Sequence, residues 1–336
     1  MTAGLRTLLA DLQRLADYAV PLALRAVCEL HVADHLAAAP RRVEDLAEAT
    51  GTHPASLYRV LRALACRGVF TETEPGRFGL TPMGQLLRGD HPLSVRDAYP
   101  LIGADLRAWT RLPETLRTGR AAFEEAHGQG YYDYLADHPE DSARFDGSVR
   151  AQNALVLRAL LSAYDWAECG HLVDVAGGDG TFLAGLLARF TSLRGTVFDL
   201  PHVVALAPEA LRRAGVSDRC EVVSGSFFDA VPRGADTYLL KTILHDWDDR
   251  RAGKILRAVR EAMRPDSTVL VLEALLPPGD EFHIGKLLDV HSLVLAGGLD
   301  RSEADYRELF AASGLAAVRI RPTPVLTVLE VRRDDT

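Results

Sequence analysis

The sequence has few cysteines, no long apolar run and no excess of positive charge. Its four cysteines, Cys28, Cys66, Cys169 and Cys220, lie far apart and form no Cys-x-x-Cys pair. They therefore predict neither a metal site nor disulfide bridges. Free thiols are typical of the cytoplasm, which we expect as the location. No stretch approaches the roughly 18 apolar residues of a membrane span, so no membrane partner is expected.

Positive charge is also outnumbered, with 38 lysines and arginines against 46 aspartates and glutamates. The chain of 336 residues carries a formal net charge of −8, which argues against a nucleic-acid-binding surface. The remaining composition, with 48% hydrophobic and 25% charged residues, is that of an ordinary globular protein. A chain of this length can build two hydrophobic cores, so we expect two domains.

The first part of the chain predicts a helical domain. Five leucines between positions 5 and 15 repeat at helical spacing. Residues 43–51 predict a short helix that ends at Gly51, a second helix follows, and residues 68–81 predict a β-hairpin. This order is that of a winged helix. Residues 41–96 hold eight arginines against six acidic residues, which is too small an excess for a DNA reader, so we expect a dimerisation or scaffold role.

From residue 171 onward, apolar strands alternate with helices. A long helix over roughly 141–163 leads into this part, and we place the boundary between a helical, winged-helix domain (1–165) and an α/β domain (166–336) just after it. The alternation predicts a doubly wound sheet of mainly parallel strands. The predicted strands are 171–176, 195–199, 220–224, 236–241, 268–273 and 325–331.

A glycine-rich loop follows the first of these strands, in Asp-Val-Ala-Gly-Gly-Asp-Gly at 174–180. Glycines let the backbone approach a ligand, and the next helix directs N–H groups toward it. Asp199 ends the second strand 21 positions after Gly178, where it suits a ribose hydroxyl pair. The spacing fits a dinucleotide fingerprint poorly, and Asp174 and Asp179 would repel a pyrophosphate. The loop instead resembles the S-adenosylmethionine (SAM) loop of class I methyltransferases.

A histidine and several acids form a second group of candidate residues. Lys241 ends an apolar strand, and His245 and Asp246 follow at the edge where α/β sheets bind ligands. Histidine is well suited to accept a proton near neutral pH. Glu273 ends the next strand, and Asp300 lies in a later loop. Carboxylates beside an imidazole fix its tautomer, although strand-end solvation or helix capping would also explain both acids.

Taken together, these motifs resemble the plant-type, or caffeic-acid-type, SAM-dependent O-methyltransferases and their bacterial relatives in natural-product pathways. The motifs are the winged-helix start, the glycine-rich loop, Phe-Asp-Leu-Pro at 198–201, Leu-His-Asp-Trp at 244–247 and Gly-Gly-x-x-Arg-Ser-Glu-Ala-Asp-Tyr at 297–306. The resemblance implies a class I methyltransferase fold, SAM as cofactor and a homodimer. It also implies methylation of a hydroxyl on an aromatic or polyketide-derived small molecule in antibiotic biosynthesis.

The resemblance assigns roles to individual residues. His245 would be the general base, with Glu273 and Asp300 beside it. Residues expected to bind the acceptor are Asp246, His291 and Ser292, the last two because they are polar on a helix where relatives are often apolar. Residues expected to bind the cofactor are Asp174, Gly177, Gly178, Asp199, Leu200, Ser226, Phe227, Lys241 and Trp247.

Three positions depart from the family pattern. Ala176 replaces a glycine, Ser226 stands where relatives often have Asp, and Asp300 where many have Glu. Two other functions are compatible with the same motifs. Proteins that resemble this family carry out hydroxylation or decarboxylation with SAM bound, and a SAM-sensing regulator would use the winged helix to bind DNA.

Overall fold

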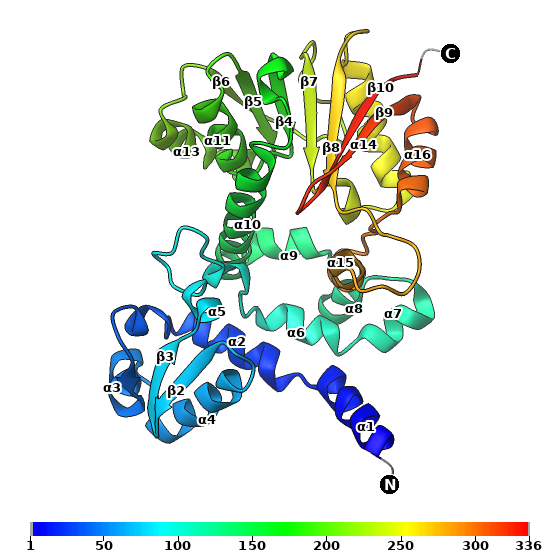
Figure 1. Cartoon of the computed structure of the whole chain (residues 1–336). Helices are drawn as coiled ribbons and strands as arrows, with labels where there is room; N and C mark the ends of the chain where they lie inside the picture. The colour runs from blue at the N-terminus through cyan, green and yellow to red at the C-terminus, as the bar shows by residue number, and fades with distance from the viewer. Residues whose placement is uncertain (1–2, 335–336) are drawn as a thin grey trace. The chain divides into compact units, whose positions relative to one another are not determined.

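The computed structural model describes residues 3–334 (Figure 1). The chain forms two compact units. One runs up to Ile102 and includes Pro139–Gln152, and the other comprises Gly103–His138 and the chain from Asn153 on. Residues 103–138 therefore belong to the unit that contains the large sheet. The boundary at residue 165 between a dimerisation domain and a catalytic domain stays a prediction. Within the described residues, no helix has both the length and the apolar character that a membrane crossing needs, and the four cysteines are free thiols.

The first unit contains the elements that the sequence predicts, in the predicted order. The helix α3 ends at Gly51, whose φ of 65° lies in the left-handed region where glycine carries no steric penalty. The hairpin strands β2 and β3 pair antiparallel, and β1 adds to β3. The elements are α1 (Ala3–Ala16), α2 (Ala19–Glu29), η1 (Asp34–Leu36), β1 (Arg41–Arg42), α3 (Val43–Thr50), α4 (Pro54–Ala65), β2 (Phe70–Glu74), β3 (Arg77–Leu80), α5 (Pro82–Gln85) and η2 (Arg96–Ala98).

The helix α1 has an apolar face that no other part of residues 3–334 covers. Leu12 is 62% exposed and Leu15 is 83% exposed. By contrast, Leu61 and Leu64 of α4 are fully buried in the core of the first unit. Exposed apolar side chains gathered on one helix mark a surface that binds another protein.

The second unit is built on a seven-stranded sheet of order β6-β5-β4-β7-β8-β10-β9. The first five strands are parallel to one another, and β10 pairs antiparallel with both β8 and β9. The chain leaves β4 for one edge and returns to β7 on its other side, so the strand order reverses between β4 and β7, where α/β folds bind ligands. The strands are β4 (His171–Val175), β5 (Arg194–Asp199), β6 (Cys220–Ser224), β7 (Thr237–Lys241), β8 (Thr268–Glu273), β9 (Leu315–Pro322) and β10 (Thr327–Arg333).

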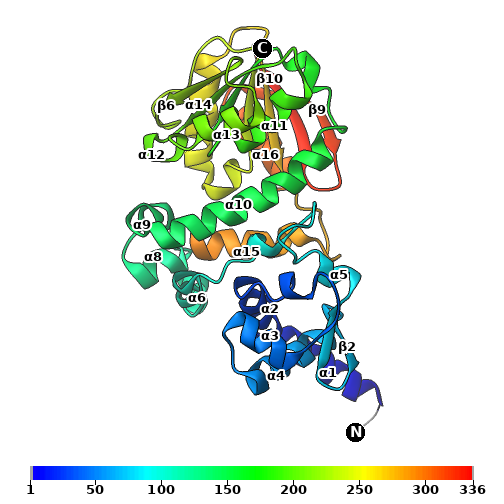
Figure 2. The ribbon, with the colours of Figure 1, turned by 90° about the vertical axis from the view of Figure 1, so that its left-hand side faces the viewer.

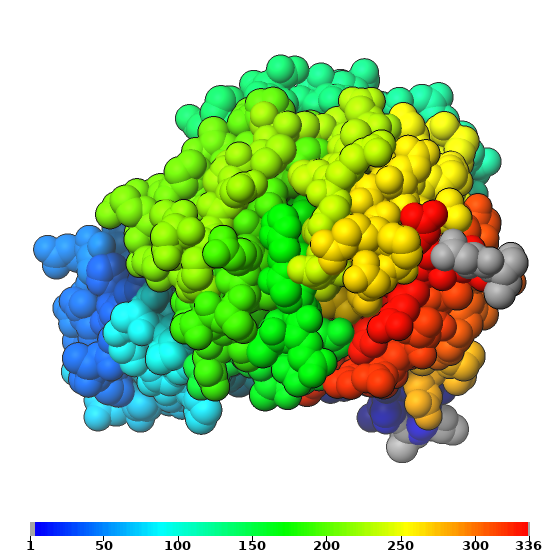
Figure 3. All heavy atoms as spheres, turned by 90° about the horizontal axis from the view of Figure 1, so that it is seen from above, coloured from blue at the N-terminus to red at the C-terminus, as the bar shows by residue number. Residues whose placement is uncertain are grey.

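This mixed α/β sheet confirms the predicted fold class. The sequence misses one strand, β9, which lies at the sheet edge and mixes arginines with apolar residues. A half-exposed edge strand lacks the continuous apolar run that reveals a central one. On the face drawn in Figure 3, the yellow segment around β8 lies beside the red C-terminal strands, as the pairing of β10 with β8 requires.

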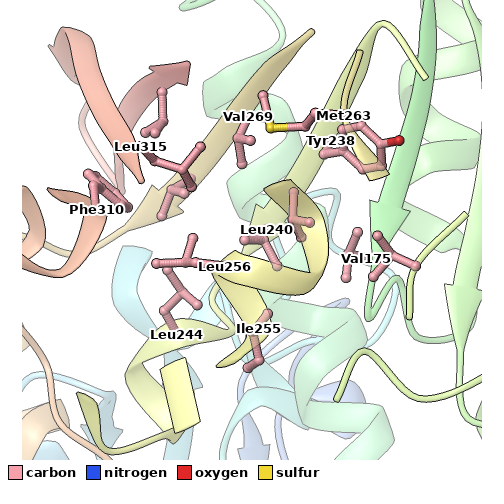
Figure 4. Packing of buried hydrophobic residues seen from close by; sticks show 14 of the residues in the cluster. Val175, Tyr238, Leu240, Leu244, Ile255, Leu256, Met263, Val269, Phe310 and Leu315 are labelled. Atoms are coloured by element: carbon pink, nitrogen blue, oxygen red, sulfur yellow. The ribbon is translucent and has the colours of Figure 1, made fainter. Parts of the chain in front are cut away.

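Helices cover both faces of the sheet. Alternate strand residues point to opposite sides, so Val173 packs with one cluster and Leu172 with the other. Figure 4 shows the cluster in which Leu240 meets Ile255 and Leu256 of α14. Each fully buried side chain of this size contributes about 1.5–3 kcal/mol. The helices around the sheet are α10 (Pro139–Leu160), η3 (Trp166–Cys169), α11 (Thr181–Arg189), α12 (Pro201–Val204), α13 (Ala207–Ala214), α14 (Asp249–Ala262) and α16 (Glu303–Ala311).

A further group of helices in the second unit packs together, as Figure 2 shows for α6, α8, α9 and α15. The short helix η4 (Leu244–Asp246) adjoins this group. α6 and α8 pack against α15, and α15 contacts η4. Phe123 of α8 holds the next helix by edge-on contacts with Tyr131 and Tyr134. These helices are α6 (Gly103–Trp109), α7 (Leu112–Thr118), α8 (Ala122–His127), α9 (Tyr131–Asp137) and α15 (Ile284–Leu295).

Candidate active site

The glycine-rich loop after β4 turns through three left-handed residues. Ala176, Gly178 and Gly180 have φ of 60°, 63° and 73°. A Cβ on Gly180 would lie 3.1 Å from Val197, so that glycine permits close packing on β5. A Cβ on Gly178 would meet nothing within 4 Å. The loop therefore exposes its backbone at Gly178, as a ligand-binding turn requires.

Asp199, at the end of β5, is tied to this loop. Its Oδ2 accepts a 2.8 Å hydrogen bond from the Gly178 N–H, and its Oδ1 accepts one of 2.6 Å from the Leu200 N–H. Burial raises the pKa of Asp199, while these two N–H groups act to lower it. The structure thus places three of the predicted cofactor residues in contact with one another.

Asp174 lies beneath the loop and has an unsatisfied oxygen. Its side chain is 1% exposed, and its Oδ2 accepts no hydrogen bond from any described residue. Burial raises the pKa of Asp174 to about 7, although Lys241 acts to lower it. A Cβ on Gly177 would come within 3.0 Å of that oxygen, so glycine keeps the approach open. A buried carboxylate oxygen without a partner is costly unless a ligand supplies a donor, and a cationic amino-acid group such as that of SAM fits it.

Lys241 ends β7 and is held by two residues that the sequence analysis missed. Its Nζ donates to Asn153 Oδ1 at 2.8 Å and to Thr242 Oγ1 at 3.3 Å. Burial lowers the pKa of Lys241, and the Asp174 charge partly offsets this effect. Thr242 has a φ of 53°, which is rare for a β-branched residue. Such strain is concentrated at functional sites.

His245 and Glu273 form the pair that the sequence predicts. The His245 Nδ1 lies 2.8 Å from Glu273 Oε2. The other oxygen, Oε1, accepts hydrogen bonds from the backbone N–H groups of Ile243 (3.0 Å) and Leu244 (2.9 Å). Glu273 is fully buried yet has partners for both oxygens. Its carboxylate therefore orients the imidazole, with Nδ1–H donating and Nε2 directed elsewhere.

A second carboxylate lies near the other ring nitrogen. Asp246 Oδ1 is 3.3 Å from His245 Nε2. Burial acts to lower the pKa of His245, but the charges of Glu273 and Asp246 outweigh it and raise that pKa to about 10. A cationic ligand bound nearby would lower it again, because like charges disfavour protonation.

Asp300 lies near this cluster without contacting the imidazole. It is 6% exposed, its Oδ2 has no hydrogen-bond partner among the described residues, and its backbone N–H donates to Asp289 Oδ1 at 2.9 Å. Burial raises the pKa of Asp300 to about 6, and the charge of His245 acts to lower it. No hydrogen bond joins Asp300 to His245 in the described structure, so its predicted assistance is limited here to charge.

The segment after α15 fixes the His245 loop in place. The Leu299 N–H donates to the His245 carbonyl at 2.7 Å. Arg301, which is 1% exposed, donates to the carbonyls of Leu244 (2.9 Å) and Trp247 (2.8 Å). A Cβ on Gly298 would collide with the His245 carbonyl. Gly298 is therefore needed for the close approach of the two backbones.

The remaining predicted residues fall into two groups. In the first group, Trp247 packs edge-on against Phe227, with ring centroids 6.0 Å apart. The Oγ of the neighbouring Ser226 accepts a hydrogen bond from the Phe228 N–H at 3.2 Å. His291 lies on α15 with its ring 5.8 Å from that of Trp109 on α6. Ser292 follows on the same helix. Nothing in these contacts tests whether His291 and Ser292 bind an acceptor, so that stays a prediction.

The sequence analysis also missed Tyr132 on α9. Its hydroxyl donates to Asp246 Oδ2 at 2.7 Å. Because 114 positions separate the two residues, no local pattern could pair them. Within residues 3–334, no group of three or more His, Cys, Asp or Glu side chains is arranged to hold a metal ion.

The chain matches two family profiles that together span most of its length. The O-methyltransferase domain matches residues 109–316, and the O-methyltransferase dimerisation domain matches residues 12–90. The chain belongs to the O-methyltransferase family.

Individual relatives are similar in sequence over nearly the whole chain. The phenazine O-methyltransferase PhzM of Lysobacter antibioticus is 42% identical over 323 residues, covering 96% of this chain and 95% of that protein. The 2,7-dihydroxy-5-methyl-1-naphthoate 7-O-methyltransferase of Streptomyces carzinostaticus is 39% identical over 331 residues, covering 98% and 99%. The aclacinomycin 10-hydroxylase of Streptomyces purpurascens is also similar, at 34% over 325 residues, covering 94% and 87%.

A solved structure shows what one relative binds. An O-methyltransferase from neocarzinostatin biosynthesis, in complex with S-adenosyl-L-homocysteine and 1,4-dihydroxy-2-naphthoic acid, matches with a TM-score of 0.82 and 39% identity over 96% of this chain and 98% of that one. The protein described here is a SAM-dependent O-methyltransferase. The predicted family, fold class and cofactor are confirmed.

Proposed function

We propose that this O-methyltransferase methylates a hydroxyl group of an aromatic or polyketide-derived small molecule in antibiotic biosynthesis, with His245 as the general base. The arrangement that carries the proposal is the His245–Glu273 pair, at the same sheet edge as the Asp174–Asp199 loop. The names of the relatives support the acceptor class, since they include phenazine and naphthoate methyltransferases. Asp246, His291 and Ser292 are the proposed acceptor contacts.

The cofactor end of the site would offer SAM two carboxylate acceptors and an exposed stretch of backbone. Asp199 would accept from the ribose hydroxyls, Gly178 would lie against the amino-acid end, and the unsatisfied Asp174 oxygen would meet positive charge. Bound SAM supplies an electrophilic methyl group. Ser226 and Phe227 would flank the adenine, Leu200 and Lys241 would contact SAM, and Trp247 would pack near it.

The residues around His245 assist removal of the acceptor proton. In water, a histidine of ordinary pKa near 6.5 would take the proton of a phenol near 10 at a cost of about 5 kcal/mol. Removing the proton while the oxygen attacks avoids most of that cost, and a positioned base typically contributes roughly 10²–10⁴-fold. Holding the reactants in line contributes up to about 7–11 kcal/mol. Positioning should therefore outweigh the base.

Replacing His245 tests how much of the rate comes from the base and how much from positioning of the reactants. We expect His245→Ala to lose on the order of 10²–10⁴-fold in kcat while keeping measurable activity. Only the neutral imidazole accepts a proton, so the ratio of wild-type to variant rate should rise with pH toward the pKa of His245, near 10 in the ligand-free protein. Methyl transfer is measured with 1,4-dihydroxy-2-naphthoic acid as probe. Equal rates across pH would contradict the assignment.

A calorimetric titration with SAM, S-adenosylhomocysteine and NAD tests the cofactor site. Wild type should bind the first two and not NAD, and Asp199→Ala should lose that binding because the ribose acid is gone. Asp218→Ala is the matched control, since Asp218 is exposed and lies outside the site. Binding of NAD without SAM, or unchanged SAM affinity in Asp199→Ala, would contradict the site described here.

One relative favours a second candidate reaction. The aclacinomycin 10-hydroxylase shows that a protein 34% identical to this chain over 325 residues can carry a hydroxylase name. Mass spectrometry of the product separates the two, because methylation adds a methyl group and hydroxylation adds an oxygen atom. The retained His245–Glu273 pair favours methyl transfer.

A SAM-sensing regulator would instead shift duplex DNA at low salt in a gel, and we expect no shift.

The match to a dimerisation domain supports a homodimer as the assembly. The exposed leucines of α1 lie within or beside the matched range and offer an apolar surface for it. The free cysteines are consistent with a reducing compartment, and we propose the cytoplasm.

A further inference from the structure

The two carboxylates that flank His245 lie at different distances from its imidazole ring. Glu273 lies 2.8 Å from Nδ1, whereas Asp246 lies 3.3 Å from Nε2. The shorter contact of Asp246 is with Tyr132, whose hydroxyl donates to Oδ2 at 2.7 Å. A continuous chain of polar contacts thus runs from Tyr132 through Asp246 and His245 to Glu273, and Tyr132 competes with the imidazole for the Asp246 carboxylate.

Tyr132 is well placed for this competition. Its ring stacks on Trp247, with centroids 6.2 Å apart and planes inclined at 29°. It lies on α9, which is fixed by the contacts of Tyr131 and Tyr134 with Phe123. The hydroxyl is thus positioned by helix packing rather than by the His245 loop itself. Desolvation of the hydroxyl and the charge of Asp246 raise the pKa of Tyr132 well above its ordinary value, so it remains a donor.

We propose that Tyr132 is a positioning residue that keeps the Asp246 carboxylate from closing onto His245 Nε2, and so leaves Nε2 accessible to the acceptor hydroxyl. The inference rests on the proposed role of His245 as the base. Asp246 is a carboxylate within reach of an imidazolium, so the two would pair directly if nothing else held Asp246. The hydroxyl of Tyr132 supplies the alternative partner.

The direction of the effect follows from the charges present. Without the Tyr132 hydroxyl, the strongest remaining partner of Asp246 is the imidazolium, so His245 holds its proton more tightly. Replacing Asp246 by a neutral amide removes a negative charge and has the opposite effect. The other charged groups that act on the pair are Glu273 of β8, Lys241 of β7 and Asp300, and Asp289 of α15 acts on Asp300.

The test measures the charge state of His245 directly. The enzyme is labelled with ¹³C at Cε1 of its histidines, saturated with S-adenosylhomocysteine and titrated by NMR, and the His245 signal is identified by its loss in His245→Gln. In Tyr132→Phe, which keeps the ring stacked on Trp247, the titration should move to higher pH by at least about half a unit. In Asp246→Asn it should move to lower pH.

The double variant shows whether Tyr132 acts through Asp246. We expect Tyr132→Phe/Asp246→Asn to titrate like Asp246→Asn alone, since the carboxylate that Tyr132 restrains is gone. A merely structural role would give the same shift in both backgrounds. Tyr99→Phe is the control, because Tyr99 is 37% exposed against 39% for Tyr132 and lies in the first unit.

Calorimetric affinity for S-adenosylhomocysteine verifies that each variant is folded at the cofactor end, and it should be unchanged in Tyr132→Phe. An unchanged titration in Tyr132→Phe, a shift to lower pH, or a shift that persists in the Asp246→Asn background would overturn the proposal. Because this titration needs no acceptor, it can fail while methyl transfer succeeds, and it can succeed if the enzyme proves to catalyse another reaction.

Discussion

At the scale of single residues, the site places carboxyl groups where the chain cannot satisfy them. Asp174 and Asp300 are each more than nine-tenths buried, and each has an oxygen without a partner among the described residues. Left-handed backbone at Ala176 and Thr242 adds strain on the same sheet edge. These features lower the stability of the fold, and ligand binding offers the natural compensation.

Asp174 should make the stability of the ligand-free protein depend on pH. Its pKa is about 7 in the folded state and near 3.9 in an unfolded chain. Between these values the folded state binds more protons, so stability falls as pH rises from about 4 to about 7. Asp174→Asn should therefore gain stability relative to wild type at pH 8 more than at pH 4, as measured by urea unfolding. Asp218→Asn, an exposed control, should show no such trend.

Replacing Ala176 by glycine, the residue usual at this position in the family, should stabilise the protein. Its φ of 60° costs a side-chain-bearing residue roughly 1–2 kcal/mol, part of which the greater freedom of glycine in the unfolded chain offsets. We expect Ala176→Gly to raise the free energy of unfolding by about 0.5–1 kcal/mol. Ala184→Gly, inside α11, should lower it by about 1 kcal/mol. A loss of stability in Ala176→Gly would show that the loop tolerates alanine without strain.

At the scale of elements, the active site depends on segments that come together from distant parts of the chain. The segment 298–301 crosses the His245 loop and is pinned to it by Leu299 and Arg301. Lys241 of β7 meets Asn153 of α10, and α9 supplies Tyr132. The strand ends set the positions of the carboxylates, and the neighbouring segments set their orientation.

Gly298 tests how tightly this crossing is held. In Gly298→Ala the new Cβ collides with the His245 carbonyl, so the His245 loop must move. We expect a loss of about 1–3 kcal/mol in stability and a clear drop in kcat, with SAM affinity retained. Gly103→Ala is the control, because its Cβ would make only an ordinary 3.7 Å contact with Arg107. Wild-type kcat in Gly298→Ala would show that the His245 loop has room to adjust.

At the scale of the whole molecule, the chain combines a catalytic unit with a matched dimerisation domain. The apolar face of α1 is left exposed by the rest of the chain that the structure describes. Burying large apolar side chains between two copies would stabilise the assembly by about 25 cal/mol for each Å² removed from water.

The leucines of α1 should therefore control the oligomeric state. Light scattering should find a dimer for wild type, and Leu8→Glu/Leu12→Glu should shift it toward the monomer, because charges on this face resist burial. Gln13→Glu adds a charge to the same helix outside the leucine series and should leave the dimer intact. A monomeric wild type would contradict the proposed homodimer.

Much of this protein was determined by sequence patterns that act locally. Apolar runs define six of the seven strands, and the glycines after β4 define the ligand loop. Asp199 and Glu273 end strands, and His245 follows the end of β7, at the edge to which a parallel sheet brings such residues. Their spacing along the chain is enough, because strand and turn signals are short-range. The family resemblance then supplied the cofactor.

Other features were decided only by the tertiary structure. The pairing of Tyr132 with Asp246 and of Asn153 with Lys241 joins residues 114 and 88 positions apart. The strain at Thr242 and the absence of a hydrogen bond from Asp300 to His245 likewise have no local signature. The physical reason is that a hydrogen bond depends on the direction and distance of two groups to within a few tenths of an ångström. Packing of whole elements sets that geometry, and no spacing of residues along the chain records it.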